Sequence, residues 1–155
     1  MEWTREGYTV STDKSRLDIA TIHAFLAEAY WSKGRTREAV VRSIANSALC
    51  FGLYAGQRQV GFARVVSDLV SHYWVCDVFV LPEYRRRGLA TWMMECVVSS
   101  PELQGMRGIL ATRDARGLYE KVGFQAPEDP RRLMWRIAGT HFTAERRTPG
   151  DRSPN

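Results

Sequence analysis

The fold is decided by one stretch, VFVLPEYRRRGLA at residues 78–90. An apolar run ends at Pro82, which cannot donate to a strand ladder, and Gly88 opens a segment with apolar residues at helical spacing. The first amide groups of a helix lack partners within the helix, and the helix dipole places partial positive charge beside them. Gly88 lets a ligand approach the backbone, and the arginines at 85–87 add fixed charge, so the pattern predicts a phosphate-binding turn. The alternative is a solvated basic turn that only caps the helix.

Hydrophobic periodicity outward from this stretch predicts the remaining elements. We expect strands at 8–11, 49–54, 59–66, 73–81, 108–111 and 133–137, the first at a sheet edge and 73–81 central. We expect helices from a capping box at Ser15 to about Tyr30, from a cap at Thr36, at 88–98, and at 114–121 closed by Gly123. The order β-α-α-β-β-β-α-β-α-β describes an α/β (α+β) fold. Its mixed, twisted sheet has about six to seven strands, with helices on both faces.

Composition indicates one ordinary globular domain. The chain has 155 residues, of which 45% are hydrophobic and 25% charged. We expect the domain to span residues 1–139, and a disordered tail rich in Pro, Ser, Arg and Asp to span 140–155. The apolar runs are too short to cross a membrane and the first residues are polar, so we expect a cytoplasmic protein with no membrane partner. Monomer and homodimer remain open.

The net charge and the cysteines limit the classes of ligand that we expect the chain to bind. A net charge of +5 is compatible with an anionic ligand, whereas nucleic acid calls for a denser basic stripe with aromatic residues between the charges. Cys50, Cys76 and Cys96 are widely spaced in apolar sequence, and the chain has no Cys-x-x-Cys motif. We therefore expect buried free thiols, no disulfide framework and no metal site.

A second motif, LYEKVGF at residues 118–124, places one tyrosine, Tyr119, on a short helix after the phosphate-binding turn. Together the two segments resemble the GNAT superfamily of acyl-CoA-dependent N-acyltransferases. Arg85-x-x-Gly88-x-Ala90 is similar to that family's Gln/Arg-x-x-Gly-x-Gly/Ala signature, Val80 to Tyr84 resembles its lead-in, and residues 118–124 resemble its second motif. The resemblance in element order covers roughly residues 8–137.

The resemblance implies acetyl-CoA as co-substrate. It implies a splay between the strand at 73–81 and the strand at 108–111, which receives the pantetheine arm against the backbone of Phe79 and Val80. The implied pyrophosphate contacts are Arg85, Arg86, Arg87, Gly88, Leu89 and Ala90. Thr112 stands where many relatives have an asparagine, and its hydroxyl can cap the following helix or reach the cofactor.

The implied chemistry is direct attack of an amine on a thioester. A phenol with a pKa of about 10 suits protonation of the departing thiolate, so Tyr119 is the candidate acid; alternatively its ring only packs against the pantetheine or the core. A backbone N–H of Phe79 or Val80 would meet the oxyanion. Asp77, alone among apolar neighbours, is the first candidate for the base, although a structural hydrogen-bonded pair explains it equally well. His72 is a second candidate, with an exposed strand-end residue as its alternative.

The segment after the first helix usually walls the acceptor site in this fold. Tyr30 and Trp31 could shield a substrate and Arg35 could grip a carboxylate, although helix-end packing is the plainer interpretation of the aromatic pair. Trp74 could face the same pocket or pack in the core. The expected reaction is acetyl transfer to a primary amine of a small or amino-acid-like molecule. The alternatives are a non-catalytic acyl-CoA sensor, acetylation of a protein or peptide amine, and a basic nucleic-acid module using Arg85 to Arg87 with Arg131 and Arg132.

Overall fold

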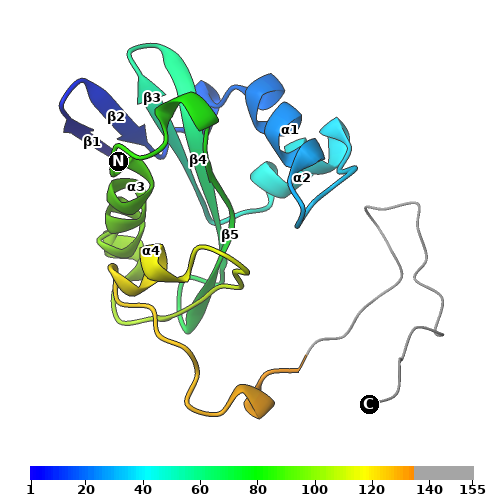
Figure 1. The fold of residues 1–155 in the computed structure, drawn as a ribbon, viewed down its shortest axis with the longest axis vertical. Helices are drawn as coiled ribbons and strands as arrows, with labels where there is room; N and C mark the ends of the chain where they lie inside the picture. Colours follow the sequence, from blue (N-terminus) through cyan, green and yellow to red (C-terminus); the bar gives the residue numbers. More distant parts are fainter. Residues whose placement is uncertain (135–155) are drawn as a thin grey trace.

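A computed structural model of the chain describes residues 1–134, which form one curved sheet with helices on both faces (Figure 1). Its strands are β1 (Glu2–Arg5), β2 (Tyr8–Ser11), β3 (Leu49–Ala55), β4 (Arg58–Ser67), β5 (His72–Val80) and β6 (Arg107–Ile109). They lie side by side in that order, antiparallel except for the parallel pair β5–β6. The expected mixed sheet is confirmed.

Each face of the sheet carries its own core. The helices are α1 (Ile19–Glu28), α2 (Arg37–Ala45), α3 (Leu89–Val98) and α4 (Arg116–Glu120). α1 and α2 bury Ile22, Leu26, Val40 and Ile44 against Phe62 and Phe79 of one face. α3 packs its apolar side, with Met93 and Val97 fully buried, on the other face, and α4 lies beside it (Figure 1). The central strands β3 and β4 are buried over most of their length, and their side chains contribute to both cores because successive residues point to opposite faces.

The N-terminal elements differ from the sequence expectation in two places. β2 is not an edge strand, because β1 precedes it in a hairpin whose turn residues Glu6 and Gly7 both have positive φ. α1 begins after Asp18 rather than at Ser15, since the Asp18 carboxylate accepts hydrogen bonds from the amides of Ala20 and Thr21. Ser15 instead lies in a short 3₁₀ turn at Lys14–Arg16. The expected cap at Thr36 is confirmed.

β5 is interrupted by a bulge at Asp77. Phe79 pairs with Phe62 and Cys76 with Arg64, so one extra residue of β5 lies between these two pairs. Asp77 has φ of 54°, a left-handed conformation that aspartate adopts more readily than most residues. The bulge breaks the alternation of β5 and brings the Asp77 side chain to the face that carries Arg64.

β5 and β6 pair over only three positions. His72, Tyr73 and Trp74 face Arg107, Gly108 and Ile109, and no further pair follows in the described chain. The remaining residues of β5 therefore separate from the segment that leads to α4, which is the splay that the resemblance implies.

The C-terminal expectations lie largely outside the described residues. Leu133 and Met134 are exposed and belong to no strand, and positions 135–137 of the expected last strand lie beyond residue 134. The proposed boundary at 139 and the tail at 140–155 lie outside as well. In residues 1–134, every helix is too short or too polar to traverse a bilayer.

Candidate active site

The turn between β5 and α3 encloses a cavity of about 380 Å³, here called the arginine-turn cavity. It is lined by Val80, Tyr84, Arg85, Arg86, Gly88, Leu89, Ala90, Thr91, Leu118 and Lys121. Gly88 is the N-cap of α3 with φ of 72°, and no side chain caps the helix start. The first amides of α3 are thus left to a ligand, which makes this end of the helix a site for anions.

The three arginines of the turn have different roles. Arg85 and Arg86 line the arginine-turn cavity, and Arg85 is oriented by a hydrogen bond of 3.0 Å from Nε to the Val80 carbonyl oxygen. Arg87 is not among the lining residues, because its guanidinium donates to the Tyr8 hydroxyl at 3.1 Å and to the Glu83 carbonyl oxygen. Arg87 is thereby linked to β2 in this structure, and its expected contact with a phosphate stays a prediction.

The two residues whose backbone was expected to contact the pantetheine lie differently. Phe79 lines neither this cavity nor the Tyr119 cavity described below, and its ring stacks on Phe25 of α1 at 4.0 Å between centroids. Its backbone contact with the cofactor stays a prediction. Val80 does line the arginine-turn cavity. Lys121, which the sequence did not single out, adds a cation from α4.

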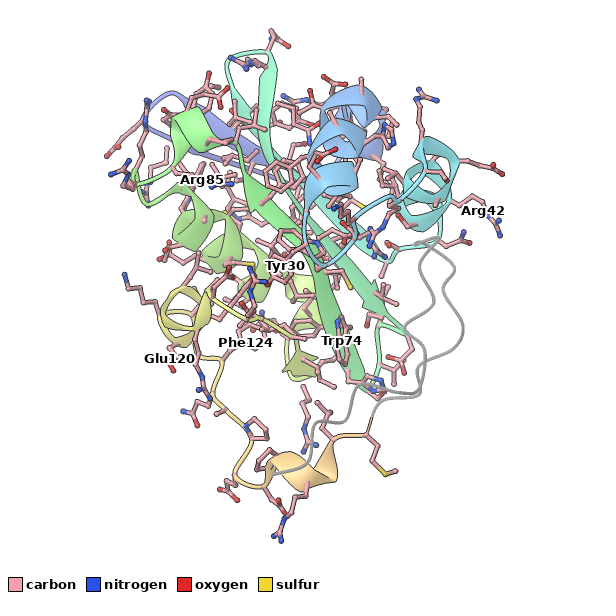
Figure 2. The ribbon with its side chains drawn as sticks, turned by 45° about the vertical axis from the view of Figure 1, so that its right-hand side comes forward. Tyr30, Arg42, Trp74, Arg85, Glu120 and Phe124 are labelled. Carbon is pink, nitrogen blue, oxygen red and sulfur yellow. The ribbon has the colours of Figure 1, made fainter. Side chains whose placement is uncertain are left out.

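A second cavity, of about 460 Å³, lies in the splay and is here called the Tyr119 cavity. It is lined by Tyr30, Trp31, Arg35, Arg64, Trp74, Val75, Cys76, Asp77, Val78, Ala111, Thr112, Arg113, Asp114, Ala115 and Tyr119. The structure thereby brings together seven residues that the sequence singled out, namely Tyr30, Trp31, Arg35, Trp74, Asp77, Thr112 and Tyr119. Figure 2 shows Arg85 at the turn before α3, with Tyr30 and Trp74 below it in this view.

Tyr119 reaches this cavity from α4. The Thr112 hydroxyl accepts a hydrogen bond of 3.0 Å from the Ala115 amide just before the helix. No side chain caps the first amides of α4, so the capping role expected for Thr112 is not found. Burial raises the pKa of Tyr119 to about 12, with smaller contributions from Tyr30 and Asp114. The phenol is consequently protonated throughout the physiological pH range and can donate a proton.

Asp77 lies in a buried ion-pair cluster. Its Oδ2 accepts from Arg35 Nη1 at 2.7 Å and from Arg64 Nε at 2.8 Å, and the Asp77 side chain is only 3% exposed. Arg64 also donates to the Ser47 hydroxyl at 3.0 Å. This arrangement fits the structural hydrogen-bonded pair that the sequence left open as the alternative to a base, because two N–H groups donate to Oδ2. The role of Asp77 as a base stays a prediction.

The segment after α1 closes the cavity on one side. The Arg113 guanidinium lies 3.7 Å from the centre of the Tyr30 ring, and the Tyr30 hydroxyl lies 3.4 Å from Asp114 Oδ1. Trp31 packs edge-on against Tyr30 at 4.9 Å. Both aromatic rings therefore belong to the rim of the cavity, although each stays nearly half exposed.

Sequence reasoning missed the second guanidinium of the cluster, Arg64. It stands mid-strand among apolar residues, which is a signal for a partnered buried charge. The β4–β5 register places Arg64 opposite Cys76, and only the bulge brings the Asp77 carboxylate to it. His72, the second candidate for a base, lies at the start of β5 in contact with the Ser71 hydroxyl and does not line the Tyr119 cavity. Among residues 1–134 there is no group of three or more His, Cys, Asp or Glu that could hold a metal ion.

Fold and site together define an acetyltransferase of the GNAT type. The family model for the GNAT acetyltransferase domain matches residues 46–126, which include both cavities except for the segment after α1. The chain belongs to this family.

Individual proteins that are similar to this chain support the same family and fold. The crystal structure of a protein from Xanthomonas campestris assigned to the GNAT family is 45% identical, covers 87% of this chain and 96% of its own, and superposes with a TM-score of 0.82. A candidate acetyltransferase of Gibberella zeae is 30% identical over 77% of this chain and 79% of its own length. A candidate acetyltransferase of Deinococcus radiodurans, 21% identical over 86% of this chain and 92% of its own, has a TM-score of 0.66 and supports the fold alone.

Proposed function

We propose that this protein transfers an acetyl group from acetyl-CoA to a primary amine of a small or amino-acid-like molecule by direct attack in a ternary complex. The observation that carries the proposal is the adjacency of the two cavities. Two residues line the arginine-turn cavity from this part of the chain: Leu118 in α4 and Lys121 just after it. Tyr119, which lies between them in sequence, lines the Tyr119 cavity. A ligand anchored by its phosphates in the first can present its far end in the second.

The residues present fit the phosphates of acetyl-CoA. The uncapped start of α3 supplies amide donors, and Arg85, Arg86 and Lys121 supply positive charge around them. A Cβ added at Gly88 would meet only Arg5 at 3.5 Å, so the space above this backbone is open to a ligand. When bound, acetyl-CoA supplies a thioester whose carbonyl carbon accepts the amine nitrogen and whose sulfur leaves as a thiol.

We assign Tyr119 to protonation of the leaving sulfur. Tyr119 is half-buried, its phenol is protonated and it lines the Tyr119 cavity, so it can give up a proton where a thiolate develops. For the oxyanion we propose a backbone N–H of the β5 bulge at Asp77 and Val78 in place of the expected Phe79 or Val80, because the bulge lines this cavity and its ladder to β4 is interrupted.

We assign Asp77 to positioning of Arg35 and Arg64 rather than to proton removal, since both guanidiniums occupy its Oδ2. The ammonium form of the substrate would then lose its proton to water before it attacks. Cys76 also lines the cavity, but burial raises the pKa of its thiol, so a thiolate nucleophile and a covalent acetyl-enzyme are disfavoured.

The decisive experiment combines binding and turnover. A thermal shift with acetyl-CoA together with thiol release over a panel of amines supports the proposal. A thermal shift with no thiol release from any amine, peptides included, would instead identify an acyl-CoA sensor. If saturating acetyl-CoA caused no thermal shift, the proposal that acetyl-CoA is the acetyl donor would be refuted.

A further inference from the structure

A contact between two distant segments spans the rim of the Tyr119 cavity. The exposed residues that line this cavity belong to residues 30–31, after α1, and 111–114, before α4, whereas its lining residues on β4 and β5 are half-buried or buried. The Arg113 guanidinium lies 3.7 Å from the centre of the Tyr30 ring, and the Arg113 amide donates to the Tyr30 hydroxyl at 3.4 Å. This contact, here called the Tyr30–Arg113 latch, joins the two exposed segments of the rim.

The two sides of the latch are held differently. Trp31 packs edge-on against Tyr30 at 4.9 Å between ring centroids and lies 6.3 Å from the Phe25 ring. Phe25 in turn stacks on Phe79, so a chain of rings ties Tyr30 to the core between α1 and the sheet. Residues 110–115 belong to no helix or strand, because the ladder between β5 and β6 ends before them. Segment 110–115 is therefore the side of the latch that can move.

The contacts that close the latch are exposed and weak. The Arg113 side chain is 67% exposed, and its ion pair with Asp114 lies within one segment and cannot hold that segment to Tyr30. The Tyr30 hydroxyl lies 3.4 Å from Asp114 Oδ1, which is long for an O–H···O hydrogen bond. An exposed cation–π contact shifts an equilibrium by about two- to fivefold. The closed latch is therefore favoured, yet thermal motion opens it readily.

The two substrates of the proposed reaction would approach the site from different sides. The arginine-turn cavity, which would hold the phosphates of acetyl-CoA, is lined by neither Tyr30 nor Arg113. Tyr119 lines the other cavity, whose exposed rim the latch spans. With acetyl-CoA in place, an acceptor amine would come to Tyr119 past this rim.

We propose that the Tyr30–Arg113 latch is a gate at the acceptor entrance of the Tyr119 cavity, which excludes bulky molecules when closed and parts to admit the acceptor. The inference rests on the proposed function for the acceptor amine, and it deepens that function by naming the residues that control access to the same site. Opening of the gate can be measured without catalysis, so the two proposals can fail separately.

Cys76 reports on the gate without turnover. It lines the Tyr119 cavity and is half-buried, whereas Cys50 and Cys96 are buried. Iodoacetamide is a small thiol reagent and pyrene maleimide a bulky one, and the rate at which each modifies Cys76 is divided by its rate with glutathione. Mass spectrometry locates the modified cysteine. All rates are measured at one pH, because burial raises the pKa of the Cys76 thiol and the reaction requires the thiolate.

Arg113→Gln removes the guanidinium and keeps the backbone of the latch. We expect pyrene maleimide to modify Cys76 about three- to fivefold faster in this variant, and iodoacetamide less than about twofold faster. Arg116→Gln is the matched control, because Arg116 is 68% exposed and lines neither cavity, and it should leave both rates unchanged. No acceleration in Arg113→Gln, or an equal acceleration in Arg116→Gln, would overturn the proposal.

Tyr30→Ala tests whether the two side chains act as one gate. It should accelerate the reaction of Cys76 with pyrene maleimide. In that background Arg113→Gln should add less than about 1.5-fold, because the contact is already lost. If the two substitutions multiplied their separate effects, the side chains would act independently and the gate would be refuted.

Turnover then tests the link to acceptor entry. Thiol release from acetyl-CoA compares a bulky with a small amine, such as tryptamine with ethylamine. In Arg113→Gln we expect the ratio of their kcat/KM values to rise about threefold in favour of the bulky amine, and the dissociation constant of acetyl-CoA to change less than about twofold. An unchanged ratio would overturn the proposal. Faster modification of Cys76 with no thiol release from any amine would refute the proposed function while the gate stands.

Discussion

Arg87 Nη1 lies 3.1 Å from the hydroxyl oxygen of Tyr8, so the third arginine of the turn is tied to β2 and leaves the anion site to its neighbours. The same guanidinium also donates to the Glu83 carbonyl oxygen and lies 5.4 Å from the Tyr84 ring. Its role is to hold the turn against the sheet.

Arg86 lines the arginine-turn cavity and Arg87 is tied to Tyr8, so substitutions of these two neighbours should affect acetyl-CoA binding differently. Arg86→Gln should raise the dissociation constant of acetyl-CoA about tenfold, because a charge-assisted contact to phosphate is lost, and Arg87→Gln should change it less than about threefold. Calorimetry with acetyl-CoA measures both. A larger loss in Arg87→Gln would show that Arg87 leaves Tyr8 to bind the ligand.

A substitution at Gly88 tests whether acetyl-CoA comes close to the backbone at the start of α3. Gly88→Ala places a Cβ in a left-handed position above the start of α3, so we expect both a destabilisation of about 1 kcal/mol and weaker acetyl-CoA binding. Gly105, with φ of 75° and nothing within 4 Å of an added Cβ, is the matched control. Gly105→Ala should show the stability loss alone. Unchanged affinity in Gly88→Ala would argue against close contact between ligand and backbone.

Removing the Tyr119 hydroxyl separates catalysis from binding. In Tyr119→Phe we expect kcat to fall about 100-fold or more while the dissociation constant of acetyl-CoA changes less than about twofold. Steady-state kinetics measures kcat, and calorimetry measures the dissociation constant of acetyl-CoA. Comparable losses in both would make Tyr119 a packing residue.

The pH dependence follows from the same assignments. The pKa of Tyr119 is raised to about 12, so its acid form is fully present below that value and should cause no decline in rate up to about pH 10. If water takes the proton of the ammonium, kcat/KM should rise about tenfold per pH unit below the pKa of the amine. A plateau near neutral pH would instead require a base within the site and would return Asp77 to that role.

Asp77→Asn tests the ion-pair cluster directly. Asparagine tolerates the left-handed bulge but leaves two buried guanidiniums without their carboxylate, so the free energy of unfolding should fall by about 3–5 kcal/mol. Glu83→Gln removes one partner of the exposed pair with Arg58 and should cost less than about 1 kcal/mol. Urea unfolding measures the free energy of unfolding of both variants. A cost for Asp77→Asn as small as that control would show that the cluster contributes little to stability.

How much of the site could be predicted depends on how its residues are distributed along the chain. The arginine-turn cavity is built mainly from the continuous stretch 80–91, so local rules for strand ends, glycine and helix starts were sufficient. The Tyr119 cavity combines segments near 30, 64, 74 and 112, and their meeting depends on sheet register. The link between Arg64 and Asp77 exists only because a bulge turns Asp77, and the chain has no local mark for it. Likewise the hydrogen bond between Arg87 and Tyr8 could not be predicted, because the two residues are remote in sequence.

The short ladder between β5 and β6 has a consequence for the ligand-bound protein. Beyond Trp74 and Ile109 the described chain has an interior sheet edge, where the backbone of β5 faces a groove instead of another strand. Edges of this kind recruit whatever can pair with them, and a ligand with amide groups along its length can act as a surrogate strand. Recognition of such an arm would rest on main-chain atoms, which substitutions do not remove. The surrounding side chains would then be free to diverge toward new acceptors while the donor is kept.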